Sequence, residues 1–128
     1  MVAEATVYVD VEGAVREWAR DTLSGLSRRV FFGPSEDASL PYVSLYRIGG
    51  PDEACLVQFD VWGAHKAQAQ SAAAALCTAI SGLGRYEYPE ANVLLHGASQ
   101  PDSRWQPDEE SGQPRYVVEA TFTATALQ

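Results

Sequence analysis

Four side chains in this sequence have the composition of a metal site: Cys55, His65, Cys77 and His96. Zinc prefers thiolate and imidazole ligands, and structural zinc sites usually place only about two to five residues between two of their ligands. Here no two of the four residues are closer than ten positions. The spacing therefore favours core cysteines and surface histidines over a zinc site, and we expect no metal and no cofactor.

A catalytic cysteine paired with a histidine is also disfavoured by the residues around each thiol. A reactive thiolate needs an electropositive and partly exposed setting. Cys55 alternates with Val57 and Phe59, while Cys77 shares a helical stripe with Leu76. Both thiols therefore belong to apolar patterns that are typical of a core. We expect no catalytic residue in this chain.

Three short motifs resemble binding sites for a dinucleotide, calcium or phosphate, but each lacks features that such a site needs. Gly82 and Gly84 lack the third glycine of a dinucleotide-binding loop and follow a helix rather than a strand. The acidic run at residues 108–110 lacks the spaced oxygen ligands of a calcium loop. Arg28 and Arg29 would point to opposite faces of a strand, so an exposed strand start is a better interpretation than a phosphate site.

Aromatic side chains in strand-like segments are better candidates for contacts with other proteins. Tyr42, Tyr46 and Trp62 lie in such segments. Their rings are more typical of a core or an interface than of a ligand cage. We therefore include Tyr42 and Tyr46 among the candidate interface residues.

The polar, proline-punctuated stretch at residues 99–114 contains the other two candidates, Arg104 and Trp105. A loop of this length is uncommon unless it has a function, and tryptophan and arginine are enriched at interface hot spots. We predict that this loop docks onto a neighbouring subunit or another protein. The alternative is that Trp105 folds back over the sheet as a lid.

Composition limits the class of protein. A chain of 128 residues fits a single domain, 1–128, and 46% hydrophobic residues lie in the globular range. Seventeen acidic and nine basic residues give a net charge of −8, which disfavours a dedicated DNA-binding domain. No run approaches the ~20 apolar residues of a membrane span, and the start lacks the basic residues of a signal peptide. We expect a soluble protein made in the cytoplasm, with no membrane partner.

Two helices are expected from the apolar spacing. The first begins at Asp10, which can cap it, and Gly25 is a possible end. The second covers residues 64–81, which contain eight alanines and are followed by Gly82 as a cap.

Strands are expected in five segments, of which the second and third form a hairpin. These segments are residues 28–32, 41–48, 55–61, 92–96 and 115–127. The last is long enough to extend beyond its own domain. The order of elements predicts an α+β fold: a mostly antiparallel sheet with two helices packed on one face. Residues 1–9 form an N-terminal segment, and residues 99–114 a long loop.

Several segments carry a resemblance to a known family. They are residues 40–50 (LPYVSLYRIGG), residues 57–63 (VQFDVWG), the alanine-rich helix and residues 115–122 (RYVVEATF). Their order and character resemble the tail terminator (tail-completion) proteins of long-tailed bacteriophages. The helix from Asp10 and the strand around Val30 fit the same arrangement. The resemblance covers about residues 10–127 and is weakest over residues 83–114.

The resemblance implies a structural protein that assembles as a ring, typically a hexamer, on the end of the tail tube. There it stops tube polymerisation and presents a surface to the head–tail connector protein. Its partners would be other copies of itself, the tail tube protein and the connector, with DNA only as passing cargo. It would lie at the head-proximal end of the tail in the virion, and in the bacterial cytoplasm during assembly. The family has no catalytic residues to carry over.

Two physical arguments agree with this function. Head-to-tail contacts that close into a ring stop growth, whereas tube subunits also stack along the axis. A negatively charged lumen would let DNA pass without binding it. The alternatives are another neck or head-completion protein, and a small cytosolic ligand-binding module or enzyme with its site between the sheet and the long loop.

Overall fold

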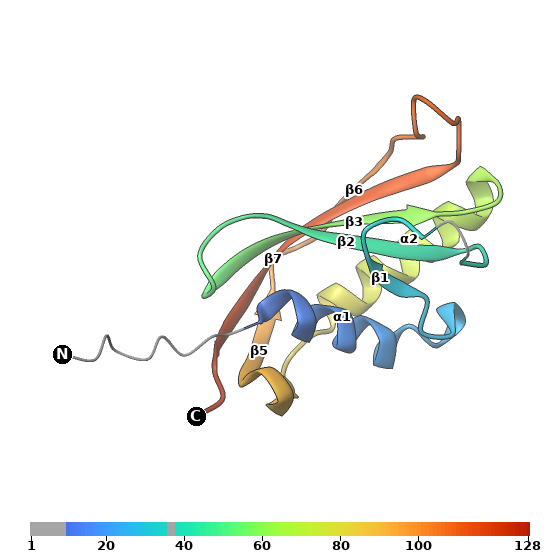
Figure 1. Cartoon of the computed structure of the whole chain (residues 1–128). Coiled ribbons are helices and arrows are strands. Elements are labelled where there is room, and N and C mark those ends of the chain that lie inside the picture. Colours follow the sequence, from blue (N-terminus) through green and yellow to red (C-terminus); the bar gives the residue numbers. More distant parts are fainter. Residues whose placement is uncertain (1–9, 36–37) are drawn as a thin grey trace.

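The computed structural model describes residues 10–35 and 38–128, so the N-terminal segment 1–9 lies outside the described residues. It contains two α-helices and a curled sheet of seven strands (Figure 1). The helices are α1 (Val11–Thr22) and α2 (Lys66–Ser81), with short 3₁₀ turns η1 (Ser24–Leu26) and η2 (Pro89–Ala91). The strands are β1 (Val30–Phe32), β2 (Tyr42–Gly49), β3 (Ala54–Trp62), β4 (Tyr86–Tyr88), β5 (Val93–Ala98), β6 (Asp102–Trp105) and β7 (Arg115–Ala126).

Helix α1 begins where the sequence predicted. The carboxylate of Asp10 accepts a hydrogen bond of 2.9 Å from the backbone N–H of Gly13, which satisfies one free donor of the first turn. The helix ends at Thr22, before the predicted Gly25, which lies in η1. Ser27 and Arg28 then have positive φ angles of 47° and 65°. This left-handed backbone delays the strand predicted from Arg28, so β1 begins two residues later, at Val30.

The first half of helix α2 lies close to the sheet because its inward residues there, Ala69 and Ala73, are small. His65 caps it: its Nδ1 accepts a hydrogen bond of 3.2 Å from the N–H of Gln68. A Cβ added to Gly63, just before the helix, would lie 2.5 Å from the backbone nitrogen of Ala69. Only glycine fits this close approach of strand end and helix. Gly82 caps the other end, as predicted.

The sheet is mostly antiparallel, as predicted, and its strand order is β1-β2-β3-β7-β5-β4, with β6 also paired to β7. The predicted hairpin is confirmed: β2 and β3 are antiparallel, with Val43 opposite Val61. Strand β1 is the exception, since it runs parallel to β2.

The prediction of an irregular loop over residues 99–114 is wrong in part. Strand β6 lies in this stretch and pairs antiparallel with β7, so that Trp105 is opposite Tyr116. The pairing has a physical reason: β5 follows one edge of β7 only as far as Phe122, and β6 supplies hydrogen-bond partners for the rest of that edge. Strand β7 is therefore paired with strands of its own chain rather than extending beyond the domain.

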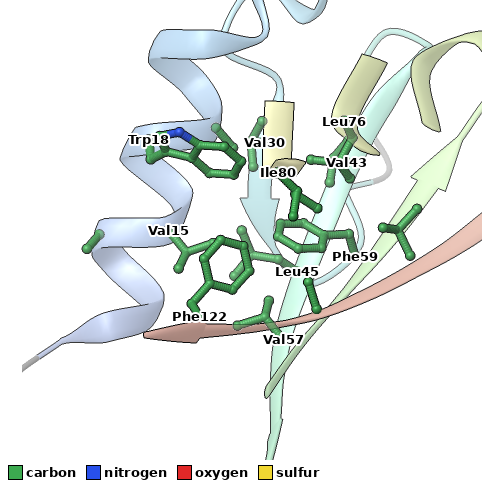
Figure 2. Packing of buried hydrophobic residues seen from close by; sticks show 14 of the residues in the cluster. Val15, Trp18, Val30, Val43, Leu45, Val57, Phe59, Leu76, Ile80 and Phe122 are labelled. Atoms are coloured by element: carbon green, nitrogen blue, oxygen red, sulfur yellow. The ribbon is translucent and has the colours of Figure 1, made fainter. Parts of the chain in front are cut away.

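Both helices cover the same face of the sheet, and the core lies between them and the strands (Figures 1 and 2). The ring of Phe122 lies at its centre, 5.7 Å from the ring of Trp18 and 5.9 Å from that of Phe59 between centroids. Further large and fully buried side chains come from the strands and from helix α2: Leu45, Val57, Val61 and Leu95 from the strands, and Leu76 and Ile80 from α2.

Helix α1 also binds the two outermost strands of the sheet order, β1 and β4. The Arg20 Nε donates a hydrogen bond of 2.9 Å to the carbonyl oxygen of Val30 in β1. The Tyr86 hydroxyl in β4 donates one of 2.6 Å to the carboxylate of Asp21. The strands at the two ends of the sheet order are thereby joined through one helix.

We expect Phe122→Ala to lower the free energy of unfolding by about 3–5 kcal/mol, because it leaves a cavity at the centre of the core. The adjacent Thr123 is exposed on the same strand, so Thr123→Ala is the matched control. Its effect should stay within about 0.5 kcal/mol. Urea unfolding measures both, and equal losses would contradict this description of the core.

Candidate interaction surface

One face of the sheet lies opposite the helices (Figure 1). It carries polar and aromatic side chains from four strands. We call this the open face. Strand alternation brings the side chains together: Ser44 is opposite Asp60, Gln58 is opposite Glu119, and Trp62 is opposite Arg115. The members of this open-face network are Ser44, Gln58, Asp60, Trp62, Arg104, Arg115 and Glu119.

Asp60 is the most unusual member, because its carboxylate is buried and the residue is only 4% exposed. Gln58 Nε2 donates a hydrogen bond of 2.9 Å to its Oδ1, and Arg115 Nη1 lies 3.6 Å from its Oδ2. Burial raises the pKa of Asp60 above its ordinary value, because removal from water disfavours the charged form. The hydrogen bond from Gln58 and the positive charges of Arg115 and Arg104 oppose part of this rise.

Arg115 joins three parts of the open face. Besides its ion pair with Asp60, its guanidinium carbon lies 5.2 Å from the centroid of the Trp62 ring. Its Nε donates a hydrogen bond of 2.8 Å to the carbonyl oxygen of Gln106, just after β6. Trp62 is fixed in turn, since its Nε1 donates to the Ser44 hydroxyl at 3.1 Å. The network thus links β2, β3, β7 and the turn that follows β6.

The candidate residue Arg104 lies on the open face at the outer strand β6. Its guanidinium is 3.4 Å from a carboxylate oxygen of Glu119 and 3.2 Å from one of Asp102. Ion pairs this exposed contribute only about 0–1 kcal/mol to stability. The side chain is therefore held in a defined position while much of it stays available for contact with another molecule.

The two candidate tyrosines differ in how much surface they offer. Tyr42 is only 8% exposed: its ring lies 6.2 Å from that of Trp62 and 5.9 Å from that of Phe31, and its hydroxyl accepts a hydrogen bond from Ser35. It packs against residues of its own chain and offers little surface to a partner. Tyr46 is half-buried on the same face.

Trp105 lies on the helix side of β6, away from the other candidates. Its ring packs 5.3 Å from that of Tyr116, and the ammonium group of Lys66 lies 4.9 Å from its centroid, yet the residue is 37% exposed. Trp105 thus has contacts within its own chain and surface left for a partner. The four candidates do not form a single site, because β6 presents Arg104 and Trp105 on opposite faces.

Sequence reasoning missed the pair of Asp60 and Arg115. The available signal was an acidic residue on the outward side of an apolar strand. Only the register between β3 and β7, which places Asp60 opposite Val117, brings the arginine within reach. Residues 55 positions apart give no local pattern that identifies them as partners.

The four residues with metal-ligand chemistry are spread over β3, the two ends of α2 and β5. Cys55 is buried in β3 and Cys77 is half-buried on α2, and burial raises the pKa of both thiols. His65 caps α2, while His96 on β5 lies 2.7 Å from the hydroxyl of Thr125. Across residues 10–35 and 38–128, no cluster of three or more His, Cys, Asp or Glu side chains could hold a metal ion.

A groove of about 590 Å³ lies between α2 and the segment from the end of α1 to η1. Its apolar lining includes Leu23, Leu26, Ala72, Ala75 and Ala79. The ligand-binding alternative placed its site between the sheet and the loop at residues 99–114, which is a different location.

No protein-family model matches the chain, and a search of curated proteins found no match either. Within the described part of the chain, neither helix is long and apolar enough to cross a membrane.

We expect Trp105→Ala to lower the free energy of unfolding by about 1–2 kcal/mol, less than a core substitution, because the ring is only partly removed from water. Trp105→Phe is the matched control, since it retains an aromatic ring against Tyr116 and Lys66. It should lose less stability in the same urea experiment. If the alanine variant were as stable as the original protein, the packing against Tyr116 would contribute nothing.

Proposed function

We propose that this protein is a phage tail terminator, which assembles as a ring on the end of the tail tube, stops its growth and forms the interface for the head connector. The proposal rests on the resemblance of residues 40–50, 57–63 and 115–122 to that family. The exposed strand β6, the unlike ends of the strands and the acidic charge of the chain also support it.

The exposure of strand β6 is the structural observation that gives the proposal its strongest support. All four of its residues are exposed, and β7 is its only strand partner in the described part of the chain. A free strand edge that presents an exposed arginine and tryptophan has the properties of a protein-binding surface. Arg104 and Trp105 are therefore the residues that we assign to contacts with neighbouring subunits or with the tube.

The connections at the two ends of the long strands differ in their exposed side chains, which suits a head-to-tail ring. The β2–β3 hairpin extends at one end and the β6–β7 turn at the other (Figure 1). The hairpin tip carries the exposed Ile48 and the ion pair of Arg47 with Asp52, whereas the other turn carries the acidic residues 108–110. Unlike ends that bind each other give a heterologous contact, and such contacts close into a ring when the rotation permits.

The acidic charge of the chain fits a ring through which DNA passes. A net charge of −8 repels the phosphate backbone, so DNA would not adhere to the lumen. The same charge would suit another neck protein, which stays a structural alternative.

A ligand-binding module is the second candidate, and the apolar groove beside α2 favours it. Its volume of about 590 Å³ is in the range of small-molecule sites. A protein of this class would work as a monomer with a bound small molecule, which separates it from a ring-forming protein.

The test is to assemble tail tubes from the tube protein of the same phage with and without this protein. We expect the tubes to become shorter and to carry a ring at one end in negative-stain images, because bound terminators block further addition. Size-exclusion chromatography with light scattering checks whether rings exist before docking.

The matched variants are Arg104→Glu with Trp105→Ala, against Glu109→Ala in the neighbouring turn. The double variant should fail to cap tubes, whereas the turn variant should still cap them. Unchanged tube lengths together with a monomer at all concentrations would reject the terminator and favour the ligand-binding module.

A further inference from the structure

The turn between β6 and β7, residues 106–114, is joined to the sheet by backbone and by side-chain hydrogen bonds. Two are backbone bonds, from the N–H of Gln106 to the Arg115 carbonyl at 3.0 Å and from the N–H of Gly63 to the Pro114 carbonyl at 3.1 Å. Arg115 Nε donates a hydrogen bond of 2.8 Å to the carbonyl oxygen of Gln106, and Gln113 Nε2 donates one of 2.6 Å to that of Gly63. Within the turn, the Asp108 carboxylate accepts hydrogen bonds from the N–H and hydroxyl of Ser111 at 2.9 and 2.7 Å. The Arg115 guanidinium is therefore one of the groups that fix the turn, and it is the one that bonds to the Gln106 carbonyl.

Asp60 holds that guanidinium in place. The side chain of Arg115 is only 16% exposed and that of Asp60 only 5%, with 3.6 Å between Nη1 and Oδ2. A cation this far removed from water is costly without a counter-ion. We propose that Asp60 and Arg115 form a latch that fixes the β6–β7 turn on the sheet and that opens when Asp60 is protonated. This inference does not depend on the proposed function.

The other charged and titratable groups around Asp60 belong to three strands: Tyr42 and Tyr46 on β2, Asp102 and Arg104 on β6, and Arg115 and Glu119 on β7. Arg104 is already paired with Asp102 and Glu119. Asp108 in the turn feels the charge of Arg115 but makes no ion pair with it. Arg115 is therefore the cation that depends on the charge of Asp60, and protonation leaves it partly buried without an ion-pair partner. The guanidinium then gains by moving towards water, which breaks its hydrogen bond with Gln106.

Acidification has opposite effects on the global stability of the protein and on the attachment of the turn. Because burial raises the pKa of Asp60 in the folded state, the carboxylate is protonated at a higher pH than in the unfolded chain. Its contribution to global stability is fully present below the unfolded pKa and is lost as the pH rises through the folded pKa. The latch behaves in the opposite way, since it is closed above the folded pKa and open below it. Acidification should thus loosen the turn while the Asp60 contribution to global stability increases.

Amide hydrogen exchange followed by NMR tests the latch on the full chain. The N–H groups of Gln106, Asp108 and Gly112 all donate hydrogen bonds in or beside the turn. After correction for intrinsic exchange rates, their protection should fall about ten-fold between about pH 7 and pH 4. The N–H of Phe122 in the core strand is the internal reference, and its protection should not fall.

Asp60→Asn is the matched variant, because the amide has the same shape and does not titrate in this range. Its turn should show the same protection at both ends of the pH range. An equal pH dependence in the variant and the original protein would overturn the latch. So would loss of the pH dependence in Asp108→Asn, since the turn's own carboxylate would then be responsible.

Arg115→Lys keeps the test decisive if Asp60→Asn does not fold. Lysine keeps the positive charge but has no Nε–H directed at Gln106. The turn of this variant should exchange rapidly at every pH, with little further change on acidification. A turn as protected as in the original protein would contradict the role of Arg115.

Discussion

Strand β7 is paired along both edges, and the positions of the other strands and of the core depend on that pairing. Strand β3 follows one edge from Trp62 to Ala54, while β6 and β5 share the other. Because successive side chains of β7 point to opposite faces of the sheet, this strand contributes both to the core and to the open face. Phe122 and its even-numbered neighbours enter the core under the helices, whereas Arg115 and Glu119 join the open-face network. A register shift of one residue would exchange these two sets, so core and network depend on the same hydrogen bonds.

Helix α1 restricts which edges of the sheet can meet another molecule. It binds the carbonyl of Val30 in β1 through Arg20, and the hydroxyl of Tyr86 in β4 through Asp21. Edge strands of soluble proteins are commonly protected by neighbouring elements in this way. Strand β6, with four exposed residues, has no comparable contact with α1, and this contrast is why our functional assignment concentrates on β6.

Local patterns predicted the parts of the fold that local interactions create. Asp10 and the apolar spacing after it identified α1, and the alanine-rich stretch identified α2. Strand β6 could not be predicted, because a polar four-residue segment becomes a strand only when β7 offers it an unpaired edge. The burial of Tyr42 depends on Phe31 and Trp62, from separate strands, so its side chain looked accessible in the sequence. The sequence identified individual candidate interface residues but not how they lie relative to one another. The terminator function stays a prediction from resemblance.

Lys66 has a consequence for the handling of this protein. It is the only lysine in the chain, and its ammonium group lies over the ring of Trp105. Among the side chains, reagents that couple to amines will therefore attach dyes, biotin or a solid support only beside β6, although an N-terminal amine reacts with the same reagents. A dye placed there would report directly on the environment of that strand. A support attached there would instead cover the surface under study, so immobilisation should use a different chemistry.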